Sequence, residues 1–191
     1  MGTFYSQEEL AQLGLKSYGE NVYIGKHVIL YHPERLEIGH DVRIDDYTII
    51  SGNVKLHNYI HISHFCGLYG GDDGIEMCDY SGLSSKVTLY AVSDDYTGES
   101  MTNPMVPAKY KPTSISGKVK ICKHGIIGAG SIVLPNVTIG EGSSVGSMSL
   151  CTRDTSEWKV YAGIPAKERK DRSKKILELE AQFEKDRQET N

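Results

Sequence analysis

Residues 127–144 read Ile-Gly-Ala-Gly-Ser-Ile, Val-Leu-Pro-Asn-Val-Thr and Ile-Gly-Glu-Gly-Ser-Ser, three six-residue units that each begin with an aliphatic residue. The spacing continues on both sides of this stretch. Apolar residues stand six apart at Ile38, Ile44, Ile50, Leu56, Ile62 and Leu68, at Met77, Leu83 and Leu89, and at Ile121, Ile127, Val133, Ile139, Val145 and Cys151. A helix face repeats about every 3.6 residues and a strand face about every 2, so this longer period indicates a solenoid of short flat faces.

The residue that follows the repeated apolar position is often glycine. Examples are Gly25, Gly39, Gly128, Gly140 and Gly146. A tight corner needs a residue whose side chain cannot clash. We therefore expect the large apolar residues to point into each coil and the small residues to form its corners.

The units of residues 127–144 resemble the hexapeptide repeat of the left-handed β-helix acyltransferases, and Tyr161-Ala-Gly-Ile-Pro-Ala-Lys167 resembles the closing motif of that family. The resemblance is closest to the branch that acetylates sugars. It implies an all-β solenoid, a left-handed parallel β-helix, whose subunits form a homotrimer with sites between them. It also implies transfer of an acetyl group from acetyl-CoA to a hydroxyl or amine of a sugar or nucleotide-sugar, in polysaccharide biosynthesis.

Three segments depart from the six-residue spacing. Residues 1–19 are expected to form a helical cap, because Ser6 and Glu9 have the spacing of a capping box. Residues 20–164 are expected to form the β-helix, from which residues 92–117 protrude as a long loop. Residues 165–191 are expected to form a C-terminal helix whose apolar face carries Ile176, Leu179 and Phe183.

Composition argues against several other classes of function. The formal net charge is −4, and there is no basic stripe with interleaved aromatic residues, so we expect no nucleic-acid partner. No apolar run reaches the roughly 18 to 20 residues that a membrane span needs. The four cysteines include no Cys-x-x-Cys pair, so we expect reduced thiols and a cytoplasmic location.

The resemblance also implies where the coenzyme lies. In the family, its pantetheine arm follows the outside of the coils at a subunit interface, against small residues and near basic side chains. The matching positions in this chain are Ala129, Ser147, Thr152, Arg153, Lys167 and Lys170. Small residues suit a groove, and Lys or Arg suits phosphate. The same residues could instead be ordinary corner residues and solvated charges.

The candidate catalytic residues are His64 and Asp94. Many family members that act on sugars or xenobiotics have a histidine at the position where this chain has Asp94. An aspartate with an ordinary pKa of about 3.9 is a weak base for a hydroxyl, whereas a neutral amine can attack without a base. The departure therefore favours N-acetylation. His64, with an ordinary pKa of about 6.5, suits a general base close to the acceptor.

The long loop also provides candidate substrate-binding residues. Asp95, Tyr90 and Asn103 flank it and could donate or accept hydrogen bonds with a sugar. They could equally anchor the loop.

Two alternative functions remain open at this point. A catalytically silent solenoid, used for binding or assembly, would explain the missing family histidine. A zinc enzyme similar to the γ-type carbonic anhydrases would use His57, His61 and His64, but these are more crowded in the sequence than that family's ligands. The acetyltransferase mechanism itself needs no metal.

Overall fold

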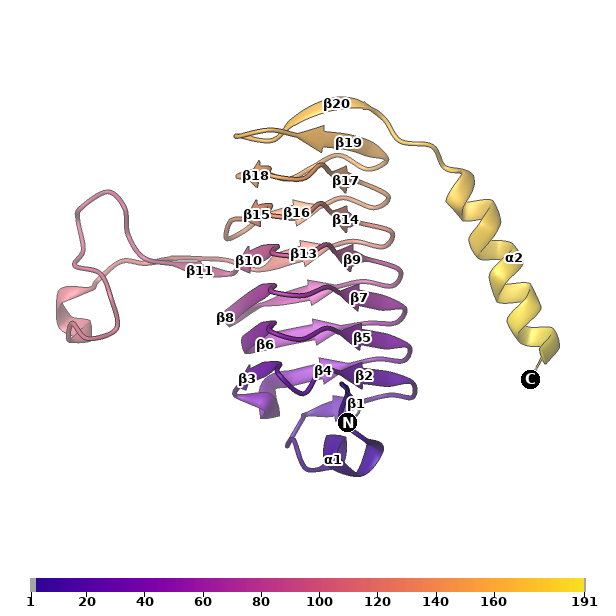
Figure 1. The fold of residues 1–191 in the computed structure, drawn as a ribbon. Coiled ribbons are helices and arrows are strands. Elements are labelled where there is room, and N and C mark those ends of the chain that lie inside the picture. Colours follow the sequence, from indigo (N-terminus) through magenta and orange to yellow (C-terminus); the bar gives the residue numbers. More distant parts are fainter. Residues whose placement is uncertain (1–2, 191) are drawn as a thin grey trace.

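The chain winds into a column of stacked triangular coils in the computed structural model, which describes residues 3–190 (Figure 1). It passes over three faces in turn, called here face 1, face 2 and face 3, before it rises to the next coil. Parallel strands stack on each face, and the strands of faces 1 and 3 belong to one sheet because β6 and β8 continue round a corner. Counted from the N-terminus, the first six coils pass through β2, β5, β7, β9, β14 and β17.

Each face is built from short strands. Face 1 contains β1 (Ser17–Tyr18), β4 (Leu36–Ile38), the second halves of β6 (Ile49–Leu56) and β8 (Gly67–Met77), β13 (Val119–Ile121) and β16 (Thr138–Ile139). Face 2 contains β2 (Val22–Ile24), β5 (Val42–Ile44), β7 (Ile60–Ile62), β9 (Gly82–Leu83), β14 (Ile126–Ile127), β17 (Ser144–Val145), β19 (Lys159–Ala162) and β20 (Lys167–Asp171). Face 3 contains β3 (Ile29–Tyr31), the first halves of β6 and β8, β10 (Thr88–Tyr90), β15 (Ile132–Val133) and β18 (Leu150–Cys151).

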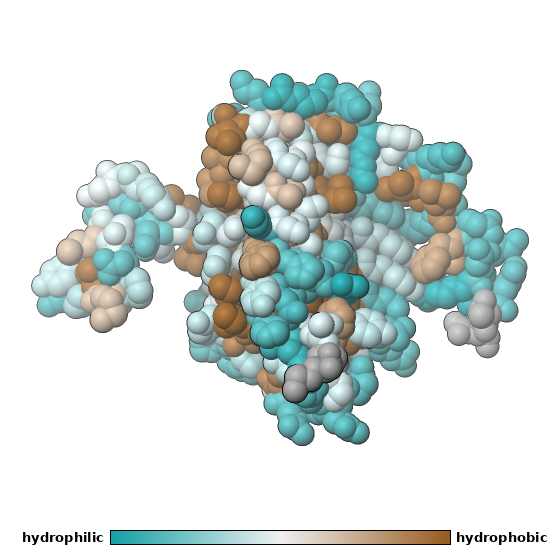
Figure 2. All heavy atoms as spheres, in the orientation of Figure 1, coloured by the Kyte–Doolittle hydropathy of each residue, from teal (hydrophilic) through white to brown (hydrophobic). Residues whose placement is uncertain are grey.

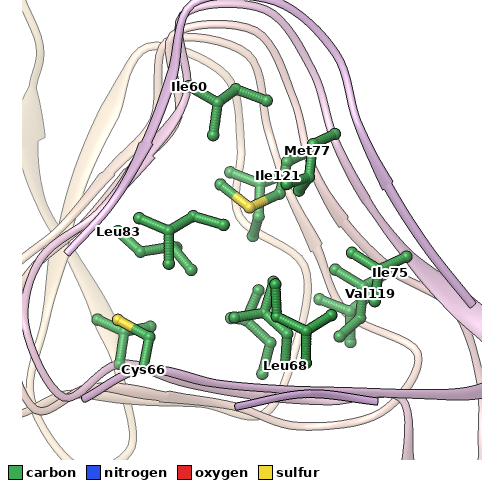
Figure 3. Packing of buried hydrophobic residues seen from close by; sticks show 14 of the residues in the cluster. Ile60, Cys66, Leu68, Ile75, Met77, Leu83, Val119 and Ile121 are labelled. Atoms are coloured by element: carbon green, nitrogen blue, oxygen red, sulfur yellow. The ribbon is translucent and has the colours of Figure 1, made fainter. Parts of the chain in front are cut away.

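The residues with six-residue spacing form the core. All of those named from Ile38 to Cys151 are buried, and none is more than 4% exposed. Figure 3 shows Ile60, Leu68 and Ile75 pointing into one triangular interior. Because neighbouring coils pair in parallel register, these side chains stack into a continuous apolar column. Truncation of one of them to alanine is expected to cost about 2–5 kcal/mol. The predicted all-β solenoid is confirmed.

The N-terminal cap is shorter than predicted. Helix α1 (Gln7–Ala11) begins with the expected capping box, in which the Glu9 amide donates to Ser6 Oγ at 3.2 Å and the Ser6 amide donates to Glu9 Oε2 at 2.7 Å. Leu10 is fully buried and belongs to the core cluster. The predicted cap of residues 1–19 ends too late, since Ser17 and Tyr18 already pair with β4 as β1.

The long loop is an ordered arm that stands away from the column (Figures 1 and 2). Its base is a two-stranded antiparallel ladder of β11 (Val92–Ser93) and β12 (Ile115–Ser116), and its tip contains the short helix η2 (Ala108–Tyr110). A second short helix, η1 (Pro33–Arg35), marks one of the breaks in the repeat. The arm leaves at the corner between face 3 and face 1, because it follows β10 and precedes β13.

The C-terminal segment differs from the prediction of a helix over residues 165–191. Residues Lys167–Asp171 form β20, which pairs antiparallel with β19 and lies across the top of the column as a hydrophilic rim (Figure 2). Helix α2 then covers Lys175–Thr190. Phe183 packs edge-on against the ring of Tyr59, whereas Leu179 is 59% exposed, so only part of the predicted apolar face is covered.

Polar contacts complete the docking of α2 against the corner between faces 1 and 2. Glu180 accepts hydrogen bonds from Lys123 Nζ at 2.5 Å and from His124 Nε2 at 2.8 Å. Within residues 3–190, no helix is long and apolar enough to cross a membrane.

Candidate active site

The polar residues of interest lie where face 2 meets face 3, called here the 2–3 corner. In the first six coils it consists of residues 25–28, 45–48, 63–66, 84–87, 128–131 and 146–149. The first residue of each segment is Gly25, Asp45, Ser63, Ser84, Gly128 or Gly146. Three polar residues therefore replace the expected glycine, in three consecutive coils.

A buried carboxylate, Asp45, organises this corner. Its side chain is only 4% exposed. Oδ1 accepts a hydrogen bond from Arg43 Nε at 2.7 Å, and Oδ2 lies 2.8 Å from His61 Nε2 and 3.5 Å from His64 Nδ1. Arg43 and His61 reach it because they stand opposite each other on the paired strands β5 and β7. Two imidazoles and one guanidinium are thus gathered around one carboxylate.

The charge of Asp45 influences both imidazole rings. Burial by itself would raise the pKa of Asp45, but the hydrogen bonds from His61 and Arg43 outweigh it and lower the pKa below its usual value. An ionised Asp45 favours the tautomers that carry a proton on His61 Nε2 and on His64 Nδ1. The other nitrogen of each neutral ring is then free to accept a proton. The structure therefore provides His64, a predicted catalytic residue, with an orienting carboxylate.

A hollow of about 470 Å³ opens beside His61. It is lined by His61, Ser63, Gly82, Leu83, Ser84, Ser85, Ile126 and Ala129. The hydroxyls of Ser63 and Ser85 are 2.9 Å apart and bond to each other. Within residues 3–190, the hydroxyl of Ser84 has no hydrogen-bond partner. Ser84 can therefore offer its hydroxyl to a bound molecule.

Small residues continue the corner above the hollow. Ala129 and Ser147 are both exposed, and the amide of Met148 donates to the Ala129 carbonyl at 2.8 Å. A Cβ added to Gly128 would lie 2.4 Å from the backbone nitrogen of Ser147, so these coils leave no room for a side chain between them. The result is a shallow strip without large side chains, which a flexible chain such as pantetheine can follow. The strip contains two of the predicted coenzyme residues.

The other predicted coenzyme residues lie elsewhere in the chain. Lys167 and Lys170 are exposed on β20, and Lys167 pairs with Ala162, which precedes the upper end of the 2–3 corner. Thr152 and Arg153 are also exposed, but they follow β18 and lie at the corner between faces 3 and 1, whereas the 2–3 corner precedes that strand. A single chain therefore does not place Arg153 beside the strip of small residues.

Asp95, a predicted substrate-binding residue, bonds to its own arm. It is buried, and it accepts hydrogen bonds from the amides of Thr97 and Ser100 at 2.9 Å and from the Thr97 hydroxyl at 2.7 Å. These bonds lower the pKa of Asp95 to about 2, with the Thr97 hydroxyl as the largest contributor. In this chain, the carboxylate of Asp95 is an anchor of the arm.

Asp94 remains exposed, and its carboxylate accepts only a long bond of 3.4 Å from the Asn103 amide among residues 3–190. Asn103 itself caps a turn by accepting from the Met105 amide at 3.0 Å, and Tyr90 stacks on a neighbouring tyrosine with ring centroids 5.1 Å apart. Asp94 follows face 3 whereas His64 precedes it. The two predicted catalytic residues therefore lie at opposite ends of that face within one chain.

The three histidines of the zinc hypothesis do not converge. His57 precedes β7 and His64 follows it, so the two histidines lie at opposite ends of that strand. Nε2 of His57 is 3.2 Å from Glu76 Oε1. Together with Glu76 and Cys78 it forms the group among residues 3–190 whose donor atoms come within 4.8 Å of one another. Lys118 Nζ already binds the Glu76 carboxylate. His61 and His64 instead share Asp45.

Sequence reasoning missed Asp45 and Ser84. A signal was nevertheless present, because both occupy the position after the inward-pointing residue where glycine is common. A polar residue there must turn into the corner, where it is either bonded, as in Asp45, or open to a ligand, as in Ser84.

No protein-family model matches the chain. The chain is 42% identical over 184 residues to the dTDP-4-amino-4,6-dideoxy-D-glucose acyltransferase of Escherichia coli, and the match covers 94% of each protein. It is 46% identical to AntD, an N-acyltransferase from Bacillus cereus, whose crystal structure with dTDP and 3-hydroxybutyryl-CoA gives a TM-score of 0.96 over 98% of this chain and 100% of that chain. PerB from Caulobacter crescentus, solved with CoA and GDP-perosamine, has a TM-score of 0.59 at 18% identity over 78% of this chain and 56% of that chain, which supports the fold alone.

The chain therefore belongs to the sugar acyltransferases of the hexapeptide-repeat β-helix family, and it is an acyltransferase that uses an acyl-CoA. This membership favours the enzyme over the silent scaffold and the zinc enzyme. Other AntD structures carry the substitutions S84C and D94A. The present chain has a serine and an aspartate at these same numbers, one in the hollow and the other on the arm.

Proposed function

We propose that this enzyme transfers an acyl group from acyl-CoA to the amino group of dTDP-4-amino-4,6-dideoxyglucose or a closely related sugar nucleotide. The observation that carries the proposal is the hollow at the 2–3 corner, which combines the free hydroxyl of Ser84 with the imidazole of His61, held by a buried carboxylate that also faces His64. The named acceptor of the E. coli relative supports it, as does the AntD structure that contains the same sugar nucleotide with coenzyme A. Acetyl is the expected acyl group.

The chemistry requires two proton transfers. An amine attacks a thioester carbonyl only as the free base, so the protonated amine first loses a proton to the unprotonated nitrogen of His64. The buried carboxylate of Asp45 stabilises the imidazolium that forms. Attack creates a C–N bond and a negative oxygen, toward which the Ser84 hydroxyl donates. The C–S bond then breaks, and the nitrogen passes its second proton to the departing sulfur, which leaves as the thiol of coenzyme A. His64 releases the first proton to solvent.

The site is proposed to be shared between subunits of a homotrimer. Asp94 lies across face 3 from the hollow of its own chain, and it projects on an arm that stands away from the column (Figure 1). In the proposed trimer, the arm of one subunit brings Asp94 to the 2–3 corner of the next, where its exposed carboxylate binds the acceptor ammonium. Arg153 would approach the neighbouring strip of small residues in the same way and bind coenzyme phosphate.

A paired acceptor assay tests the proposed reaction. Thiol release from acetyl-CoA is measured with dTDP-4-amino-4,6-dideoxyglucose and with the dTDP sugar that carries a hydroxyl at the same carbon. The proposal predicts turnover of the amine only. Equal or greater turnover of the hydroxyl compound would refute N-acylation.

Hybrid trimers test the shared site. Asp94→Asn and Ser84→Ala should each impair activity, and their co-expression should restore about a quarter of the wild-type activity, because random mixing places two intact halves at about one site in four. Hybrids no more active than either parent variant would refute a site built from two chains.

The proposed location is the cytoplasm, where acyl-CoA is available and thiols stay reduced. All four cysteines are unpaired in the structure, in agreement with a reducing compartment.

A further inference from the structure

Histidine and cysteine replace glycine at the corner between faces 1 and 2, called here the 1–2 corner. The first residue of this corner is Gly39 in the second coil and Gly140 in the sixth, whereas in the three coils between them it is His57, Cys78 and Cys122. A Cβ added to Gly39 would lie 2.5 Å from the carbonyl oxygen of His57, so the coils are closely packed where glycine stands. The three intervening coils therefore place an imidazole and two thiols one above another.

Strand pairing brings His57 and Cys78 together with Glu76. The His57 amide donates to the Met77 carbonyl at 2.9 Å, which places His57 one coil below Cys78. Glu76 and Cys78 stand on either side of the buried Met77, so both point to the outer side of the column. His57 Nε2 is 3.2 Å from Glu76 Oε1, and one donor atom of each of the three residues lies within 4.8 Å of the other two. One nitrogen, one oxygen and one sulfur therefore face the same small volume.

This set of donor atoms suits a divalent ion of intermediate softness, such as Zn²⁺. Zinc binds imidazole nitrogen and carboxylate oxygen at about 2.0–2.2 Å and thiolate sulfur at about 2.3 Å, so tetrahedral ligands lie roughly 3.3–3.6 Å from one another. The separation of 3.2 Å between the His57 nitrogen and the Glu76 oxygen is close to this value. Mg²⁺ and Ca²⁺ prefer oxygen ligands, and a thiolate disfavours them. Three protein ligands would leave a fourth position on the zinc for water.

The surroundings orient the Glu76 carboxylate and leave it open to solvent. Lys118 Nζ binds Oε2, so Oε1 is turned toward His57, and a hydrogen bond to the oxygen that does not bind the ion is usual for a ligating carboxylate. Lys120 Nζ is 3.8 Å from Oε1, and its charge would oppose a bound cation. The side chains of His57 and Glu76 are 32% and 17% exposed, and Glu76 also lines a hollow of about 280 Å³ on face 1. An ion can therefore reach the three donors from solvent.

We propose that His57, Glu76 and Cys78 form a zinc site that joins the third and fourth coils. Glu76 binds through Oε1, and His57 binds through Nε2 after the proton on that nitrogen moves to Nδ1. Cys78 binds as a thiolate, and its proton is released to solvent. The site lies at the opposite end of face 2 from the 2–3 corner, since His57 precedes β7 and His64 follows it. Zinc therefore stabilises the column and takes no part in the proposed acyl transfer.

Titration of the reduced, metal-free full-length protein with Co²⁺ tests the site, because Co²⁺ can replace Zn²⁺ and its bond to a thiolate gives an absorption band. One Co²⁺ should bind per chain, with a thiolate-to-cobalt band that added Zn²⁺ removes. Cys78→Ser should abolish the band, and His57→Ala should weaken Co²⁺ binding by more than about tenfold. Lys120→Gln should tighten binding, because it removes a positive charge 3.8 Å from the ligating oxygen. Cys122→Ser is the matched control: it removes a thiol at the same position of the next coil, outside the three-residue group, and should keep both band and affinity.

Stability and activity measurements distinguish a lost ligand from a misfolded variant. Zn²⁺ at about 100 times its Kd should raise the Tm of the wild type by about 5–10 °C and leave the Tm of Cys78→Ser unchanged. Without metal, His57→Ala and Cys78→Ser should both release coenzyme A from acetyl-CoA at the wild-type rate. Absence of a thiolate band in the wild type, or a band that persists in Cys78→Ser or disappears in Cys122→Ser, would overturn the zinc site and leave the proposed function standing. Loss of acyl transfer in those variants while they remain folded would overturn the separation of the two sites.

Discussion

Replacement of Asp45 by asparagine should separate the orienting role of this residue from its structural role. The amide is almost the same size as the carboxylate, but it has only one acceptor oxygen. Asp45 uses both of its oxygens, one for Arg43 at 2.7 Å and the other for His61 at 2.8 Å. In Asp45→Asn, one of these donors must therefore face the amide NH₂ group, and neither His61 nor His64 keeps a charged partner.

The expected loss of stability is moderate. A hydrogen bond to a charged group contributes about 1.5–3 kcal/mol, and Arg43 and His61 are half exposed and can rebind water, so we expect a loss of about 2 kcal/mol. For a chain of this length, that loss lowers Tm by about 4–8 °C. The catalytic effect should be larger. If His64 acts as a base in the tautomer that Asp45 fixes, kcat should fall by about 10²–10⁴-fold, with little change in the KM for acyl-CoA.

Asp46→Asn is the matched control. Asp46 belongs to the same corner and accepts a hydrogen bond from the His27 amide at 2.9 Å, but it contacts neither His61 nor His64. Thermal unfolding and thiol release should show lower stability for both variants and a loss of kcat for Asp45→Asn alone. A fall in Tm with wild-type kcat and an unchanged pH–rate profile in Asp45→Asn would refute the orienting role.

Three further predictions concern the arm, helix α2 and the thiols. Asp95→Asn should accelerate proteolysis within the arm more than Asp94→Asn, because Asp95 accepts two backbone hydrogen bonds at 2.9 Å within the arm, whereas Asp94 accepts a single long one of 3.4 Å. Glu180→Gln should speed the proteolytic cleavage of α2 at neutral pH. Burial alone would raise the pKa of Glu180, but the bonds from Lys123 and His124 outweigh it and lower the pKa, so wild-type α2 should loosen only as pH falls through a value below the ordinary pKa of a glutamate. Burial raises the pKa of Cys66 to about 11, so this thiol should react with a thiol reagent at pH 8 only after unfolding, as mass spectrometry would show.

The core was predictable because the six-residue period directly reports which side chains point inward. Every residue from Ile38 to Cys151 identified in this way is buried. Cys151 illustrates the strength of the pattern, since the period alone predicts packing and not chemistry for this thiol. The same pattern places the arm, because the period is lost at the point where the chain leaves the column.

The site was less predictable because it depends on register between coils. Ile44-Asp45-Asp46 does not show which aspartate turns inward, and His61 is 16 residues away from Asp45 in the sequence. Only the pairing of β5 with β7 brings them together. Strand β20 was missed for a different reason: its sequence is charged throughout, and it forms through backbone pairing with β19.

Identification of the product tests the central claim most directly. The wild-type protein would be incubated with acetyl-CoA and dTDP-4-amino-4,6-dideoxyglucose, and the nucleotide product would be analysed by NMR and mass spectrometry. Acyl transfer to the amine predicts an acetamide at C4 of the sugar, with one thiol released for each product formed. An ester on a sugar hydroxyl, or unchanged sugar nucleotide from protein that binds both substrates, would contradict it.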